Sequence, residues 1–263
     1  MSDAEAEPQP SLPLWRSAVR RLGRLAGAAL DVVYPPACAG CGVLLAGSPG
    51  LCPRCWSAVP FIERPYCEVL GTPFSHDLGP GILSADAIAS PPPFDRLRSA
   101  ALYDAHARAL VQALKYRDRT DLAPMMARWM VRAADGAVEA TDLVIPVPLH
   151  RLRLLQRKFN QSAELARAIG RIAGKPVRFD AVGRIRRIRR QVGLGQRARE
   201  ENVRGAFAVT EAGREALFGR RVVLVDDVYT TGATVSAVTR ALKRAGAVDV
   251  TVLTFARALP GPI

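Results

Sequence analysis

Two adjacent carboxylates near the C-terminus, Asp226 and Asp227, are the residues of this chain best suited by type and spacing to bind a ligand. They follow four apolar residues at 222–225, a run long enough for a buried strand and too short for a helix. Apolar residues at helical spacing predict a helix from about 235 to 244. Between strand and helix lies a turn of small and hydroxyl-bearing residues, namely Thr230, Thr231, Gly232, Ala233 and Thr234.

This order of strand, acid pair, turn and helix indicates a sugar-phosphate site. Ligands of open α/β sheets bind outside the carboxyl ends of the strands. Backbone N–H groups, threonine hydroxyls and a helix N-terminus together suit a phosphate. Carboxylates do not attract a phosphate, so Asp226 and Asp227 need another partner, such as the hydroxyls of a ribose or a bound cation.

A second buried strand is predicted at 142–149, with prolines at its exit, and it should neighbour the strand at 222–225. Positive charges follow it directly, on Arg151, Arg153, Arg157 and Lys158. These charges leave the carboxyl end of a strand beside the acid pair, which is where a pyrophosphate would lie.

Lys115 stands at the end of a predicted helix at 108–116, which follows a short strand at 97–103. Its cluster with Tyr116 and Arg117 is either a solvated helix end or a group that reaches an anion in the adjoining cleft. Asp121 is expected to cap a further helix that runs to about 133. The remaining predicted elements are a helix at 162–173 and strands at 176–182 and 206–209.

The segment at 183–204 is polar, contains glycine and is very basic. A loop of this length in a compact domain is more often functional than accidental, so we interpret it as a lid over the site. A solvated loop or a surface that contacts nucleic acid are the alternatives.

Four cysteines, Cys38, Cys41, Cys52 and Cys55, have the spacing C-x2-C-x10-C-x2-C. Paired knuckles of this kind place four thiolates around one tetrahedral Zn²⁺, and a site closed by four sulfurs is structural and not catalytic. Two disulfides are the competing interpretation, but a sugar-phosphate site belongs with a reducing cytosol, so we expect zinc and a cytoplasmic protein. Cys67 lacks a partner and is expected to be a free or buried thiol.

The chain is expected to divide into three parts. Residues 1–34 comprise an acidic, proline-rich tail and an amphipathic helix at 14–33, which we expect to pack onto the next module and not to direct export. Residues 35–93 form the zinc-ribbon module and a proline-rich linker, and residues 94–263 form the larger domain. No apolar run reaches the roughly 18 residues of a membrane span, so none is predicted.

The formal net charge of +13 is concentrated in one segment. Residues 150–204 contain 16 Lys and Arg against 4 Asp and Glu. Such a concentration indicates an anionic partner, either a nucleic acid or a polyphosphate, unless it is only an arginine-rich surface. The composition, 49% hydrophobic and 23% charged, is that of a globular protein.

The stretch at 221–234 resembles the signature of type I phosphoribosyltransferases, which bind 5-phosphoribosyl-1-pyrophosphate with Mg²⁺. The resemblance implies that Asp226 and Asp227 hold the ribose hydroxyls and that residues 230–234 hold the 5-phosphate. It also implies an α/β fold in which a parallel sheet carries helices on both faces and follows a small zinc-ribbon module.

Nearly the whole chain from Pro35 on resembles the ComF family of competence proteins. The matching features, in order, are the Cys38–Cys55 zinc module, the motif at 114–116, the motif at 147–151, Phe159-Asn160-Gln161, Gln191, Arg197, Asn202, Ala206-Phe207 and the stretch at 225–234. Two departures stand out: the second knuckle at Cys67 is incomplete, and Lys158 stands where the family often has glycine.

Two functions follow as hypotheses. The first is a Mg²⁺-dependent phosphoribosyltransferase of unknown acceptor, in which Lys115, Arg151 and Arg157 hold the leaving pyrophosphate and catalysis is mainly electrostatic. The second is a protein that handles single-stranded DNA during DNA uptake, as the resemblance implies, with a regulatory or vestigial sugar-phosphate site. The sequence leaves the acceptor and the oligomeric state open.

Overall fold

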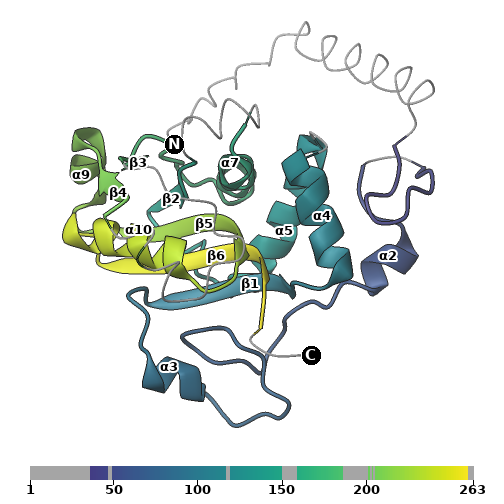
Figure 1. The fold of residues 1–263 in the computed structure, drawn as a ribbon, viewed down its shortest axis with the longest axis horizontal. Helices are drawn as coiled ribbons and strands as arrows, with labels where there is room; N and C mark the ends of the chain where they lie inside the picture. The colour runs from purple at the N-terminus through teal and green to yellow at the C-terminus, as the bar shows by residue number, and fades with distance from the viewer. Residues whose placement is uncertain are drawn as a thin grey trace, which may run out of the picture.

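A computed structural model describes residues 36–46, 49–116, 119–149, 159–185, 201, 203 and 205–259 (Figure 1). The expected N-terminal helix, Arg151, Arg153, Arg157, Lys158 and most of the expected lid lie outside these residues. No helix among the described residues is long and apolar enough to cross a membrane.

The main sheet has four parallel strands in the order β1-β6-β5-β2. Their bounds are Arg96–Leu102 for β1, Leu143–Pro146 for β2, Arg221–Tyr229 for β5 and Asp249–Arg257 for β6. Leu143 pairs with Val222 and Pro146 with Val225, which confirms that the strand before the basic segment neighbours the strand that carries the acid pair. The carboxyl ends of β2 and β5 therefore lie side by side.

Both faces of this sheet are buried, because successive side chains of a strand point to opposite faces. Val223 and Val225 of β5 pack into one cluster with α4 (Ala105–Tyr116), α5 (Ala123–Ala133) and α7 (Gln161–Ala173). Val222 and Leu224 pack into a second cluster with α10 (Ala233–Arg244). The expected architecture, a parallel sheet with helices on both faces, is confirmed (Figure 1).

Several boundaries differ from those the sequence predicts. β5 continues to Tyr229, so both aspartates belong to the strand and do not follow it, and α10 begins two residues earlier than expected. The predicted strand at 176–182 is wrong: only Val177 bridges to Val144, and strand β3 spans Val182–Arg184. β2 has four residues, so it offers this segment little edge to pair with.

The expected cap at Asp121 is also wrong. Residues Thr120–Leu122 form a short 3-10 turn, η1, and α5 starts at Ala123 without a side-chain cap. The Asp121 carboxylate instead accepts hydrogen bonds from the Arg119 guanidinium, at 2.9 Å from Nε and 2.8 Å from Nη2. Pro124 lies in the first turn of α5, where its fixed φ suits a helix start.

The other elements are short. β3 pairs antiparallel with β4 (Phe207–Val209), and α9 (Glu211–Leu217) follows. The N-terminal module contributes α2 (Pro53–Ser57) and α3 (Ala85–Ala89). In Figure 1, α3 lies on the side of β1 opposite to α4 and α5.

The zinc-ribbon module packs against the edge strand β1. Phe61 bridges to Ala101, and the Ile62 N–H donates to the Ala100 carbonyl at 3.0 Å. The Phe61 ring meets Trp129 of α5 edge-on, with centroids 4.9 Å apart. Because this contact covers an otherwise open sheet edge, the module is part of the packed core and not a loosely tethered appendage.

Candidate functional site

The acid pair lies at the carboxyl end of β5, where it contacts α4 and α7. Asp226 accepts a hydrogen bond from the Ser162 hydroxyl at 2.9 Å and another from the Asp227 backbone N–H at 2.9 Å. Asp227 is 8% exposed, and its Oδ2 lies 2.5 Å from Nζ of Lys115. The structure therefore brings both Lys115 and Ser162 to the acid pair, whereas the sequence placed Lys115 either at a solvated helix end or beside an anion in the cleft.

Burial and the neighbouring charge of Asp227 raise the pKa of Asp226 to about 7, against the opposing effects of the Ser162 hydrogen bond and Lys115. The folded protein thus holds a proton at Asp226 over a range in which the unfolded chain, with a carboxyl pKa of about 4, has lost it. In the ligand-free protein, the positive charge of Lys115 partly offsets the negative charge of the two adjacent carboxyl groups.

This shift predicts how stability depends on pH. Because the folded state binds the proton more tightly, the contribution of Asp226 to the free energy of unfolding falls as pH rises from about 4 to about 7. In urea unfolding at a series of pH values, the free energy of unfolding should decline less steeply with rising pH for Asp226→Asn than for the unmodified protein. Asp249→Asn, at the opposite end of the sheet, is the control. Equal slopes for the unmodified protein and Asp226→Asn would contradict the assignment.

The turn after β5 leads directly into a helix N-terminus. Thr230, Thr231 and Gly232 connect β5 to α10, and Ala233 and Thr234 are the first residues of the helix. The Ser236 N–H donates to the Gly232 carbonyl at 2.8 Å, which closes the first helical turn. The earlier N–H groups of a helix have no intrahelical acceptor, so they point at whatever lies before the helix N-terminus.

Gly232 is required by its backbone and by its neighbour. Its φ of +72° lies in the left-handed region, which glycine adopts without strain. A Cβ at this position would lie 2.5 Å from Oη and 2.8 Å from Cζ of Tyr229. The Tyr229 ring thus packs directly beneath the turn.

Other candidate residues fall outside the described residues. These are Arg151, Arg157 and the main part of the lid expected at 183–204. The sequence reasoning did not single out Ser162, Tyr229 or Arg257, all of which the structure places around this end of the sheet. Ser162 could have been identified from its position, because it directly follows Asn160-Gln161 at the start of a predicted helix.

The four cysteines of the N-terminal module form one cluster. Their sulfur atoms all lie within 4.8 Å of one another, and those of Cys41 and Cys52 are 3.7 Å apart. Zn–S bonds of about 2.3 Å in a tetrahedron separate the sulfurs by about 3.8 Å, so the cluster fits one zinc ion. The Cys52 N–H also donates to the Cys38 sulfur at 3.3 Å, and a hydrogen bond of this kind orients a metal-binding thiolate.

Cys67 is buried, with 0% exposure, and is a free thiol as expected. Its sulfur accepts hydrogen bonds from the N–H groups of Leu70 at 3.4 Å and Ser84 at 3.2 Å. Leu70 and Ala87 pack beside it in the α10-side core.

Comparisons with known proteins agree with both modules. A family model described as "Double zinc ribbon domain" matches residues 29–87, and one described as "Phosphoribosyl transferase domain" matches residues 162–261. The chain is 32% identical to DNA utilization protein YhgH of Shigella flexneri over 234 residues, which cover 87% of this chain and all of that protein. It is 27% identical to competence protein F of Haemophilus influenzae over 214 residues, 80% of this chain and 91% of that one.

Among solved structures, glutamine phosphoribosylpyrophosphate amidotransferase of B. subtilis, complexed with ADP and GMP, is similar over 54% of this chain. The matched part is 30% of that enzyme's length, with 23% identity and a TM-score of 0.34. The assignment of the two modules rests on the family models, the four-strand parallel sheet and the cysteine cluster.

Proposed function

The chain belongs to the ComF family, and on that premise we propose that it binds phosphoribosyl pyrophosphate with Mg²⁺ at the carboxyl ends of β5 and β2. The observation that carries the proposal is the acid pair of Asp226 and Asp227 on β5, held by Ser162 and Lys115 and followed by a helix N-terminus. A ribose needs hydrogen-bond acceptors for its hydroxyls, and a phosphate needs N–H donors. One end of one strand offers both.

In this proposal each group binds one part of the ligand. The carboxylates of Asp226 and Asp227 accept hydrogen bonds from the ribose 2′- and 3′-hydroxyls, and residues 230–234 hold the 5-phosphate through backbone N–H groups and hydroxyls. Lys115 lies 2.5 Å from Asp227, within reach of a pyrophosphate on the adjacent side. Arg151 and Arg157, beyond the described residues, are the further cations proposed for the pyrophosphate.

The donor set also fits Mg²⁺. This ion prefers oxygen ligands and is commonly bound by one or two carboxylates together with substrate phosphates. When bound, it would neutralise charge that develops on the departing pyrophosphate. Lys115 and the carboxylates orient the sugar and supply charge around it, so transfer to an acceptor would rely mainly on electrostatic stabilisation.

Calorimetry tests the binding proposal. Phosphoribosyl pyrophosphate titrated into the protein with Mg²⁺ should bind, and the double substitution Asp226→Ala with Asp227→Ala should weaken binding by about 100-fold or more, because charge-assisted hydrogen bonds contribute about 1.5–3 kcal/mol each. Asp249→Ala, at the other end of the sheet, is the matched control. Undiminished affinity in the double variant would refute the proposed site.

A second function, contact with single-stranded DNA, is favoured by two observations. Residues 150–204 hold 16 of the chain's 37 Lys and Arg, and the similar proteins carry the names DNA utilization protein and competence protein F. Contacts of basic side chains with DNA phosphates lose affinity as salt rises, by roughly 0.7 log units per log unit of salt for each phosphate. Failure to retain an oligonucleotide even at low salt would exclude this function.

A further inference from the structure

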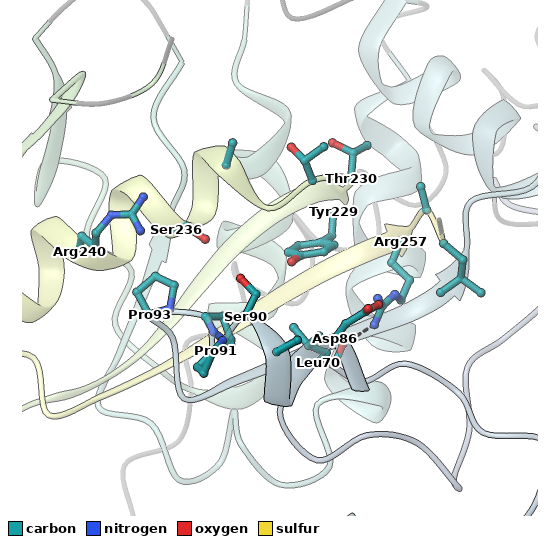
Figure 2. A pocket seen from close by; sticks show the side chains of 16 residues that line it. Leu70, Asp86, Ser90, Pro91, Pro93, Tyr229, Thr230, Ser236, Arg240 and Arg257 are labelled. Carbon is teal, nitrogen blue, oxygen red and sulfur yellow. Dashed lines mark hydrogen bonds between the residues drawn. The ribbon is translucent and has the colours of Figure 1, made fainter. Parts of the chain in front are cut away.

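A cavity of about 650 Å³ lies at the seam between the zinc-ribbon module and the phosphoribosyltransferase domain (Figure 2). One wall consists of α3 and residues 90–93, and the other of α10 with the ends of β5 and β6. We call it the seam pocket. Thr230 and Thr231 of the turn also border it, but the acid pair does not. Its volume is that of a small-molecule site and exceeds what a phosphate alone would fill.

One end of the seam pocket holds a buried guanidinium that needs an acceptor. Arg257 is 4% exposed and donates a hydrogen bond to the Leu70 carbonyl. Its Nε finds no acceptor among the residues that the structure describes. Burial lowers the pKa of Arg257, against the opposing electrostatic effects of Tyr229, Cys67 and Asp86. A buried donor without a partner is costly, and a ligand acceptor at this end would satisfy it.

Asp86 stands beside this guanidinium. Figure 2 shows Asp86, Arg257 and Leu70 together at one end of the cavity, with the Tyr229 ring next to them. A donor and a carboxylate acceptor side by side match a ligand edge that has a carbonyl next to an N–H. The half-buried Tyr229 ring also lines the cavity, and the Arg257 guanidinium carbon lies over it, 5.7 Å from the ring centroid.

The opposite end of the cavity is suited to an anion. Ser236 and Arg240 lie four residues apart on α10 and therefore share one face of the helix. Figure 2 shows both at this end, with Ser90 between them and Tyr229. Arg240 is exposed to solvent, and a guanidinium with nearby hydroxyls recognises phosphate through charge-assisted hydrogen bonds.

We propose that the seam pocket binds one nucleotide unit whose base presents an amide edge, as guanine and thymine do. The base lies against Tyr229 with its carbonyl toward Arg257 and its N–H toward Asp86, and the phosphate lies at Arg240. The same chemistry is offered by a free mononucleotide and by one unit of single-stranded DNA. This site goes beyond the sugar-phosphate site and depends on the zinc-ribbon module, which supplies Asp86 and Ser90.

The decisive variant fills the pocket from the module's side. Ala89 lines the cavity on α3, whereas its neighbour Ile88 is 66% exposed and does not line it. We expect Ala89→Trp to weaken nucleotide binding by about 10-fold or more, and Ile88→Trp, the matched control, to leave it unchanged. Neither residue belongs to the acid pair, and phosphoribosyl pyrophosphate binding measured in both variants shows whether the turn at 230–234, which also borders the pocket, is disturbed.

Two probes distinguish the sources. Calorimetry with dGMP, dTMP and dAMP tests the free nucleotide, and fluorescence anisotropy with a labelled single-stranded oligothymidylate tests a unit within DNA. The proposal is supported if Ala89→Trp weakens the binding of either probe and Ile88→Trp preserves it. The probe that binds then shows whether the ligand is a free mononucleotide or a unit of single-stranded DNA. Absence of binding by both probes, or binding that Ala89→Trp leaves intact, overturns it, whatever the result with phosphoribosyl pyrophosphate.

Two surface substitutions test the orientation of whichever nucleotide binds. Asp86→Asn should remove the preference for guanine and thymine over adenine, because an amide can donate as well as accept. Arg240→Ala should weaken binding of a nucleoside monophosphate and leave the corresponding nucleoside unaffected. A preference that survives Asp86→Asn, or an equal loss for nucleoside and nucleotide in Arg240→Ala, contradicts the proposed orientation.

Discussion

Gly232→Ala should be among the most damaging single substitutions in the chain. The new Cβ would lie 2.5 Å from the Tyr229 hydroxyl oxygen, and the residue would keep a φ of +72°. The left-handed backbone costs about 1–2 kcal/mol for a residue with a side chain, and the overpacking about 1–3 kcal/mol more. We expect the midpoint of thermal unfolding to fall by roughly 10 °C and the affinity for phosphoribosyl pyrophosphate to fall with it.

Two variants separate the causes. Gly219 has a nearly equal φ of +70°, and a Cβ there meets nothing within 4 Å. Gly219→Ala should therefore show the backbone penalty alone. Adding Tyr229→Leu to Gly232→Ala should restore part of the stability, because it removes the ring that the new methyl group strikes. If Gly219→Ala proves as harmful as Gly232→Ala, the contact with Tyr229 is not the cause.

The second large effect concerns zinc. Removing the ion with a chelator, or replacing one ligand in Cys55→Ser, should unfold the N-terminal module, because structural zinc contributes about 10–16 kcal/mol in isolated zinc-finger peptides. Because the module packs on β1 through Phe61, we expect the larger domain of the zinc-free protein to unfold at a lower temperature than that of the zinc-bound protein. Metal content by elemental analysis and tryptophan fluorescence, to which Trp56 and Trp129 contribute, would report the change.

Cys67→Ser is the matched control for this experiment. Cys67 is a buried thiol outside the four-cysteine cluster. We expect it to lower stability modestly and to leave one zinc ion per chain. Loss of zinc in Cys67→Ser, or retention of zinc in Cys55→Ser, would show that the cluster has been assigned to the wrong residues.

Local patterns were enough to predict the elements that carry local chemistry. Each of these patterns is recognisable from residues that lie within about a dozen positions of one another. They are the C-x2-C pairs, the apolar run before the acid pair and the basic segment after β2. Strand adjacency also followed, because ligand sites of parallel sheets form where neighbouring strands end. The pairing of β2 with β5 confirms that inference.

What the sequence did not predict depends on contacts between distant residues. Arg257 donates a hydrogen bond to the Leu70 carbonyl, 187 residues earlier in the chain, and a contact over this separation cannot be predicted from hydrophobic periodicity. Asp121 has the right residue type for a cap, but Arg119 takes its carboxylate. β6 is different: its alternation of valine, threonine and larger apolar residues is typical of a strand, yet the elements predicted from the sequence include none at 249–257.

The place of β6 in the sheet constrains when this protein can fold. It is the last described strand of the chain, yet it lies between β1 and β5 and pairs with both. While the chain is being synthesised, β1 has no partner strand until about 150 later residues have been added. We therefore expect the larger domain to stay open in the nascent chain until β6 has left the ribosome. The zinc-ribbon module, complete within its own short segment, can form first.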